Sequence, residues 1–443
     1  MSSLAGAVTM RPMSNSLNSG AESTAAAAPR RSLWRHADYM KIWLAATVSL
    51  MGSSVSQLAI PFIATVVLKS SAIEVALLGV VEMAPFILFA LPAGAWLDRV
   101  RRRPVLIAGD LGRGLALLTI PIAFAAGALT IWQLYAVGFV TGSLTVLFDV
   151  ADQSYLPALL ERDDLVEGNA KLQFPQASAQ VVGPAFGGGL IALVGAPFAV
   201  IVDAVSFFAS GGLISLIRKH EPVPERRVAS DGSHTSLRQD IAEGLRYVLG
   251  NRYLRMIAGS TATSNLGTSI AFSIFPIFVY RELGLSVALV GAVFGLGSLG
   301  VLLGAVVSAG LSRRFGVGPA IVGSMFITGP ATILIFLMPS EVPVAATFLL
   351  ASSFLTGLTA VVYNVNQVSF RQAITPLDMQ GRMNATMRFV VWGTIPVGSL
   401  IGGLLASFLP VRTTIGIGAA VASTAFLWVL LSPVRSLREI PKS

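Results

Sequence analysis

The stretch PAGAWLDRVRRRP, residues 92–104, lies between two long apolar runs and places one acid and four arginines within residues 98–103. Apolar residues dominate on both sides of it. Of the 443 residues, 54% are hydrophobic and 12% are charged, whereas soluble domains carry about 25% charged residues. The mean hydropathy is +0.75. These values predict an integral membrane protein.

The apolar runs are long enough to cross a bilayer. A hydrocarbon core about 30 Å thick needs about 20 mostly apolar residues in a helix. The chain contains twelve such runs, which predicts an all-α integral membrane fold with twelve transmembrane helices. They cover residues 42–68, 72–97, 105–126, 131–155, 172–194 and 198–217, and then 256–280, 285–311, 320–338, 342–370, 384–409 and 413–431.

An internal repeat divides these runs into two sets. Pro61 recurs as Pro276, and Asn169-Ala170 recurs as Asn384-Ala385 at the same offset. A repeat of half the chain predicts two pseudo-symmetric six-helix bundles, with a solute site near the midplane between them.

The predicted domain order follows from the runs and the repeat. We expect a disordered cytoplasmic tail, an N-terminal six-helix bundle, a cytoplasmic connector with an amphipathic helix, a C-terminal six-helix bundle and a second cytoplasmic tail. Their ranges are 1–41, 42–217, 218–255, 256–431 and 432–443.

The net charge of +9 could indicate a nucleic-acid partner, but the positions of the basic residues favour another explanation. Most of the 31 Lys and Arg residues fall in loops on one side of the predicted bundle. Only Lys69, Arg281 and Arg412 fall in loops on the other side. The positive-inside rule then places both termini in the cytoplasm of a multi-pass protein. We therefore expect no nucleic-acid partner and a location in the plasma membrane, specifically a bacterial inner membrane.

The opening stretch contains a candidate gating loop. Gly94 permits close helix packing. Asp98 stands at the C-terminal end of a predicted helix, where the helix dipole disfavours an anion, so it should seek a cationic or helix N-terminal partner. A contact made in only one orientation of the two bundles would act as a latch. Alternatively, the arginines only anchor the loop to anionic lipid and set topology. The loop residues are Gly94, Asp98, Arg99, Arg101, Arg102 and Arg103.

Twelve spans, a two-fold repeat and this loop together resemble the major facilitator superfamily. Gly94, Asp98, Arg99, Arg102 and Arg103 match the superfamily signature G-x-x-x-D-R-x-G-R-R, and Arg101 replaces its glycine. The resemblance implies transport by alternating access.

A second motif, GPAFGGG at residues 183–189, matches a G-P-x-x-G-G signature that the superfamily concentrates in proton-antiporting exporters. Its matching residues are Gly183, Pro184, Gly187 and Gly188. They could equally form a helix-packing face without directional meaning. The segments LPALLERDDLVEGNA, VDAVSFF and EGLRYVLGNRYLRMI resemble the branch of the enterobactin exporter and macrolide-efflux proteins.

Ionisable residues inside the runs are functional candidates, because an Asp or Lys at the bilayer centre costs about 2.5–3.5 kcal/mol on insertion scales. Glu82 lies near the midplane, roughly 15 Å into its run. It is the candidate for proton coupling, the alternative being a hydrogen bond to a neighbouring helix. Five other residues could form an inner charge network that acts as a gate, although Asp110 and Arg113 also suit a simple ion pair. The five are Asp110, Arg113, Asp149, Asp152 and Arg388.

Polar side chains within the runs are candidates for a central cavity. In the superfamily that the chain resembles, spans one, four, seven and ten line the path, although polar side chains also join helices. The candidates are Ser53, Ser56, Gln57, Asn265, Asn364, Asn366 and Gln367.

These features predict a secondary transporter that exports small amphipathic molecules, such as a drug, siderophore or secondary metabolite, by alternating access with proton antiport. The alternative is proton-coupled uptake of a small organic solute. A primary pump is disfavoured because no lysine follows a glycine in a phosphate-binding loop, and a membrane enzyme because the spans offer no His, Cys or Ser triad. We expect a monomer that is not an enzyme, with small-molecule substrate, protons and the lipid bilayer as partners. We expect no metal and no cofactor beyond the proton gradient.

Overall fold

The computed structural model describes residues 33–97, 100–161, 164–219, 237–376 and 379–438. These ranges are almost entirely helical, and twelve of their helices are long and apolar enough to cross a membrane. The expected all-α membrane fold is therefore confirmed. Asp98 and Arg99 of the predicted gating loop, and most of the predicted N-terminal tail, lie outside the described residues.

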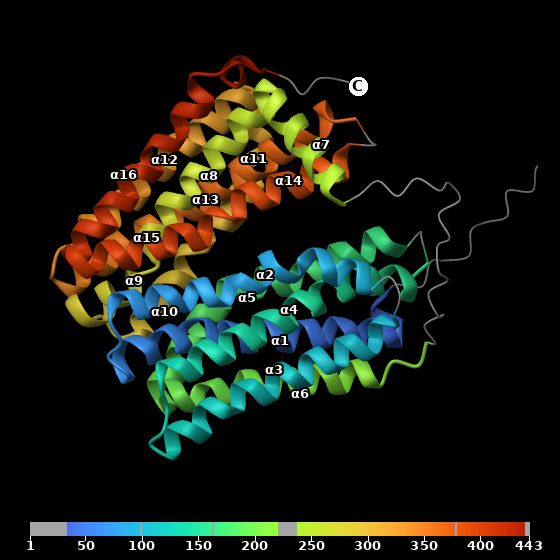
Figure 1. Ribbon diagram of the computed structural model, residues 1–443, viewed down its shortest axis with the longest axis vertical. Helices are drawn as coiled ribbons and strands as arrows, with labels where there is room; N and C mark the ends of the chain where they lie inside the picture. Colours follow the sequence, from blue (N-terminus) through green and yellow to red (C-terminus); the bar gives the residue numbers. More distant parts are fainter. Residues whose placement is uncertain (1–32, 98–99, 162–163, 220–236, 377–378, 439–443) are drawn as a thin grey trace, which may run out of the picture.

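The first half contains six spanning segments (Figure 1). A short 3-10 helix, η1 (Leu33–Arg35), precedes them. They are α1 (Ala37–Phe62) continued by the π-helix η2 (Ile63–Val67), α2 (Ala72–Leu97), α3 (Arg102–Ala125), α4 (Ile131–Leu159), α5 (Leu165–Val194) and α6 (Ala196–Ser215).

The second half repeats this arrangement after the connecting helix α7 (Leu237–Gly250). A short 3-10 helix, η5 (Pro433–Ser436), follows the last spanning segment of this half. The spanning segments are α8 (Arg252–Phe272) with α9 (Phe275–Ile277) and the π-helix η4 (Phe278–Glu282), α10 (Val287–Gly297) with α11 (Leu299–Phe315), α12 (Val317–Phe336), α13 (Val342–Ile374), α14 (Gln380–Trp392) with α15 (Thr394–Phe408), and α16 (Val411–Leu430).

The two π-helices occupy equivalent positions, at the same offset that relates Pro61 to Pro276. Each of these prolines lies two residues before a π-helix. Proline has no N–H and crowds the preceding helical turn, and a π-helix is one way in which a helix absorbs such a disturbance. In both halves the wider turn is closed by a backbone hydrogen bond, from Leu68 to Ile63 at 2.9 Å and from Leu283 to Phe278 at 3.0 Å.

Two helix pairs join the halves: α5 packs on α10, and α2 packs on α15. Glycines permit the close approach. A Cβ atom added to Gly188 would lie 2.7 Å from the carbonyl oxygen of Val287 and 3.1 Å from the Cα atom of Gly291. At the equivalent place in the other pair, Gly403 packs against Ala76. We call these two pairs the seams.

Additional contacts between the halves lie at the end of the bundle that carries the π-helices, which we call the far end. There Arg281 Nε donates a hydrogen bond to the carbonyl oxygen of Thr65 at 2.7 Å. The ring of Tyr280 meets that of Phe62 edge-on, with centroids 5.0 Å apart. Toward the opposite end, where α1 begins and α16 ends, the two halves diverge (Figure 1). We call this the terminal end.

The connecting helix α7 lies at the terminal end of the C-terminal half and packs against α14. Val248 is fully buried there. Glu243 forms an ion pair with Arg382, with 3.1 Å between Oε2 and Nη1. Leu245, about one helical turn before Val248 and therefore on the same face of α7, is exposed. Part of the amphipathic face of α7 is thus used for contact with α14.

We expect Gly291→Val to loosen the closed far end, because its side chain would collide with the carbonyl oxygen of Pro184. Overpacking costs about 1–3 kcal/mol, which shifts a two-state equilibrium by roughly tenfold. The chain has no Cys, so a single cysteine at the buried position Ile277 reports opening by its rate of maleimide labelling. Gly189→Val is the matched control, because Gly189 has open space around its Cα. Equal labelling rates in the two variants would contradict the prediction.

Candidate functional site

A buried ion pair lies at the junction of α3, α4 and α6. Arg113 Nη2 is 2.5 Å from Oδ1 of Asp110, one helical turn earlier on α3. Both residues are buried, at 5% and 0% exposed. The guanidinium lies between two aromatic rings, 4.3 Å from the centroid of Phe148 on α4 and 4.2 Å from that of Phe207 on α6. This cation–π sandwich stabilises the cation within the N-terminal half.

Two further acids on α4 belong to the same group. Asp149 and Asp152 interact electrostatically with Arg113, and Asp152 also interacts with Asp110. The structure thus brings together four of the five residues predicted to form the inner charge network. The fifth, Arg388, lies exposed on α14 of the other half.

The guanidinium of Arg388 lies 5.7 Å from the ring centroid of Trp392. Trp392 in turn meets Phe86 of α2 edge-on, with centroids 6.5 Å apart. Arg388 therefore lies on the side of α14 that faces α2. Among the described residues it forms no ion pair with Asp110, Asp149 or Asp152.

Sequence reasoning assigned no role to Asp203, which the structure places at the centre of α6 with 2% of its surface exposed. The hydroxyls of Ser53 and Ser206 each lie 3.3 Å from its Oδ1 atom. Ser56 faces the same carboxyl, and Arg113 interacts with it electrostatically. The only early signal was an acid inside an apolar run, because its serine partners on α1 are distant in sequence.

Glu82 lies on α2 and faces α4 at a position where α4 has a glycine. A Cβ atom added to Gly138 would lie 3.0 Å from Cγ of Glu82. One turn further along α4, a Cβ at Gly142 would lie 2.7 Å from the carbonyl oxygen of Glu82. Among the described residues, no hydrogen bond or ion pair is found for the Glu82 carboxyl. An acid without a fixed partner in a spanning helix is a candidate for reversible protonation.

The predicted cavity residues divide into exposed and buried sets. Gln57 on α1 and Asn364 on α13 are exposed, and Asn364 Oδ1 accepts a hydrogen bond from Gln367 at 3.3 Å. Asn265 is half-buried and donates a hydrogen bond to the carbonyl oxygen of Val391 at 3.0 Å. Asn366 is buried and bonds Ser308 of α11 at 3.3 Å. These last two asparagines join helices. Ser53 is half-buried, and Ser56 and Gln367 are buried.

The described part of the arginine loop contacts its own half. Arg103 donates hydrogen bonds to the carbonyl oxygens of Ile214, at 3.2 Å, and Ser215. These carbonyls belong to the last turn of α6, where the helix supplies few donors; that of Ile214 also accepts a hydrogen bond from the Ile217 amide at 3.2 Å. Arg101 is exposed just before α3, and Arg102 is half-buried in its first turn. Gly94 lies within α2.

The glycine motif of α5 faces two directions. A Cβ atom at Gly187 would lie 3.1 Å from the Cα atom of Val55, and Gly183 packs on Ser54, so these glycines contact α1 of the same half. Gly188 and the carbonyl of Pro184 face Gly291 on the other half. The motif therefore lies where one helix contacts both its own bundle and a seam.

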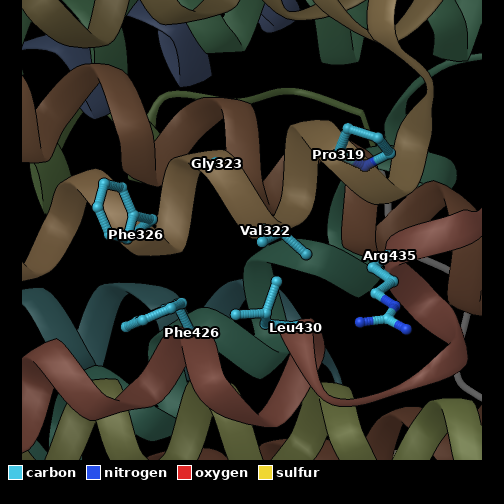
Figure 2. Close-up of a pocket in the computed structure, with 7 residues that line it drawn as sticks. All are labelled: Pro319, Val322, Gly323, Phe326, Phe426, Leu430 and Arg435. Atoms are coloured by element: carbon cyan, nitrogen blue, oxygen red, sulfur yellow. The ribbon is translucent and has the colours of Figure 1, made fainter.

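A groove of about 490 Å³ lies between α12 and α16 of the C-terminal half (Figure 2). Its lining is almost wholly apolar and ends at Arg435. Because α12 and α16 take part in neither seam, the groove belongs to the lipid-facing surface, where apolar side chains are expected. Its lining residues are Pro319, Val322, Gly323, Phe326, Phe426, Leu430 and Arg435.

Comparison with known sequences places the chain among membrane transporters. Residues 26–442 match the family model described as transmembrane secretion effector. The chain is 26% identical over 385 residues to the multidrug efflux pump Tap of Mycolicibacterium fortuitum, a match that covers 84% of this chain and 90% of the pump. It is 25% identical over 417 residues to the Tap pump of Mycobacterium tuberculosis (strain ATCC 25618 / H37Rv), covering 91% and 95%.

Solved structures share the fold. A bacterial homologue of the iron transporter ferroportin, in an inward-facing state, superposes with a TM-score of 0.68 at 19% identity, covering 90% of this chain and 99% of that one. A bacterial homologue of the human lysosomal transporter Spinster superposes with a TM-score of 0.66 at 14% identity, covering 92% and 97%.

We expect Arg113→Met to lower the free energy of unfolding by about 3–5 kcal/mol, because it leaves Asp110 buried without its cation. Adding Asp110→Asn removes the stranded charge and should restore most of the loss. Thermal unfolding of the purified protein in detergent measures both changes. The exposed Arg101→Met is the control and should change stability by less than about 0.5 kcal/mol. If the single and double variants are equally unstable, the ion pair is not the cause.

Proposed function

The chain belongs to the transmembrane secretion effector family of the major facilitator superfamily, and we propose that it exports small amphipathic molecules in exchange for protons. The family and fold are those of transporters, as the arginine loop and the repeat predicted. Multidrug efflux pumps among its relatives support export. The proposed substrates are drugs, siderophores or secondary metabolites.

The observation that carries the proposal is the one-sided closure of the bundle. The halves are held together along two seams and by Arg281, Thr65, Phe62 and Tyr280 at the far end, while they diverge toward the terminal end (Figure 1). Two related bundles that meet at one end can rock about their seams and expose a central site alternately to each side.

The direction in which the molecule faces follows from its charge distribution. We propose that both termini lie in the cytoplasm, as the basic loops indicate; the far end then faces outward, and the divergence at the terminal end supports an inward-open state. We propose that the protein acts as a monomer in the bacterial inner membrane, which its bacterial efflux relatives support.

Proton exchange supplies enough energy for this task. One proton moving inward across 100 mV releases about 2.3 kcal/mol, which supports roughly a fortyfold gradient of a neutral solute. Glu82 is the proposed coupling carboxyl, because it lies in a spanning helix at a seam and has no fixed partner among the described residues. Protonation would neutralise it in one state, and release would follow when the other side opens.

We expect proteoliposomes loaded at about pH 6 and diluted to about pH 8 to accumulate the cationic dye ethidium. Two pH units correspond to about 2.7 kcal/mol and thus to at most about a hundredfold accumulation. Glu82→Gln should abolish accumulation while ethidium-for-ethidium exchange continues, because the amide carries no proton. Dye fluorescence measures both rates.

Glu74→Gln is the control. Glu74 lies at the far end of the same helix, half-buried, with its carboxylate accepting a hydrogen bond from the Ser71 amide at 2.7 Å, and this variant should keep accumulation. Loss of internal dye down the proton gradient would instead establish symport and overturn the proposal.

A further inference from the structure

The N-terminal half encloses more acid than base within the membrane. Asp110, Asp149, Asp152 and Asp203 all interact with Arg113, and Arg113 is hydrogen-bonded to Asp110. The other three carboxyls have no cation of their own in the described part of the chain. Ionised carboxylates left unpaired in a membrane interior are costly. Binding of protons by some of these three carboxyls would therefore stabilise the cluster.

Asp203 differs from the other acids in being surrounded by hydroxyl groups. Ser206 Oγ lies 2.8 Å from the backbone carbonyl oxygen of Asp203 and 3.3 Å from its Oδ1 atom. A hydroxyl has one proton and two lone pairs. When Ser206 donates to the backbone, its oxygen can accept a hydrogen bond from a protonated Asp203. When the carboxyl is ionised, Ser53 and Ser206 can donate to it instead.

Unpartnered buried atoms around the group provide a second observation. Ser56 Oγ, Asp110 Oδ2, Arg113 Nε and Ser210 Oγ are buried without a hydrogen-bond partner, and each of these residues is at most 7% exposed. Ser56 faces Asp203, and Ser210 faces Asp110. Each of these hydroxyls thus faces a carboxyl without being within strict hydrogen-bond geometry of it, and because an unmade buried hydrogen bond is unfavourable, a small side-chain shift could form these bonds.

The groups that face Asp203 can be assigned helix by helix. On α1 they are hydroxyls, Ser53 and Ser56. On α3 the charged group is Arg113, with Asp110 behind it. On α4, Asp149 and Asp152 act through Arg113. Among the described residues, α5 brings no ionisable side chain to the carboxyl. A change in the charge of Asp203 therefore acts electrostatically on the guanidinium of Arg113, which contacts side chains of α3, α4 and α6.

Ser53 also connects Asp203 with the exposed side of α1. It is half-buried, and Gln57, one helical turn further along the same face, is exposed. We propose that Asp203 is a proton-binding site separate from Glu82. Asp203 exchanges its proton with the solute path through the Ser53 hydroxyl. Binding converts the carboxylate to a carboxylic acid and needs no other reactant. Its contribution to transport rests on the proposed function.

Infrared spectroscopy of the purified full-length protein tests the site without any substrate. Between about pH 5 and about pH 9, a range chosen to span protonated and ionised carboxyls, the wild type should show a titrating carboxylic C=O band that Asp203→Asn removes. Glu82→Gln should leave this band in place. A wild-type spectrum unchanged by Asp203→Asn overturns the proposal.

A second pair of variants keeps the test decisive if Asp203→Asn does not fold. Ser53→Ala removes the hydroxyl that bonds Asp203 and should shift the pH midpoint of the same band. The neighbouring Ser54→Ala is the matched control, because the Ser54 hydroxyl donates to Leu50 of its own helix at 2.9 Å, and it should not shift the midpoint. Equal midpoints in both variants would show that the Ser53 hydroxyl does not bond the Asp203 carboxyl, and would so remove it as the exchanging group.

Measurements of transport then distinguish the proposed proton site at Asp203 from the proposed export function. With ethidium in proteoliposomes, Asp203→Asn should lower accumulation driven by the pH gradient about tenfold or more, a change worth about 1.4 kcal/mol, while dye exchange continues. If the wild type does not move ethidium but the infrared band titrates, the function proposed above fails and the site stands. If a sodium gradient drives accumulation and no carboxylic band titrates, the oxygen cluster binds sodium and the proposal is wrong.

Discussion

Backbone hydrogen bonding in hydrocarbon is the constraint on which this structure depends. A bilayer core offers no water to unpaired N–H and C=O groups, so each crossing must satisfy its own backbone. The described spans are accordingly helical almost throughout, and even the disturbance at Pro61 is met by a wider hydrogen-bonded turn. Since lipid supplies little hydrophobic force between helices, association relies on close packing, which explains the glycines at both seams.

The two halves share a backbone plan but differ in charge. By the repeat offset, Asp203 corresponds to Gly418 and Arg113 to Thr328. Thr328 there shares a hydrogen bond with Thr359 at 3.0 Å, so the C-terminal half uses neutral hydroxyls where the N-terminal half uses an ion pair. Packing is therefore symmetric while electrostatics are not. In an exporter, this difference would concentrate proton binding in one bundle and leave the other to respond through the seams.

Sequence reasoning recovered the fold because its signals are local. Apolar length, basic loops and an internal repeat each depend on short segments or on a fixed offset. The site depends on direction around each helix, which depth along a span does not reveal. Asp110 and Arg388 were grouped by depth, yet one lies inside the N-terminal bundle and the other exposed on the opposite half. Asp203 lacked a role because the serines that surround it come largely from α1.

The paired π-helices also bear on the history of the chain. Such helices are rare, well under 1% of residues in known proteins, and here one follows a proline at the equivalent place in each half. Independent origin of both would require the same uncommon backbone insertion twice. A single ancestral six-helix gene that already carried the widened turn, and then duplicated in tandem, supplies both at once. The charged group of the N-terminal half would then be a later divergence between the two copies.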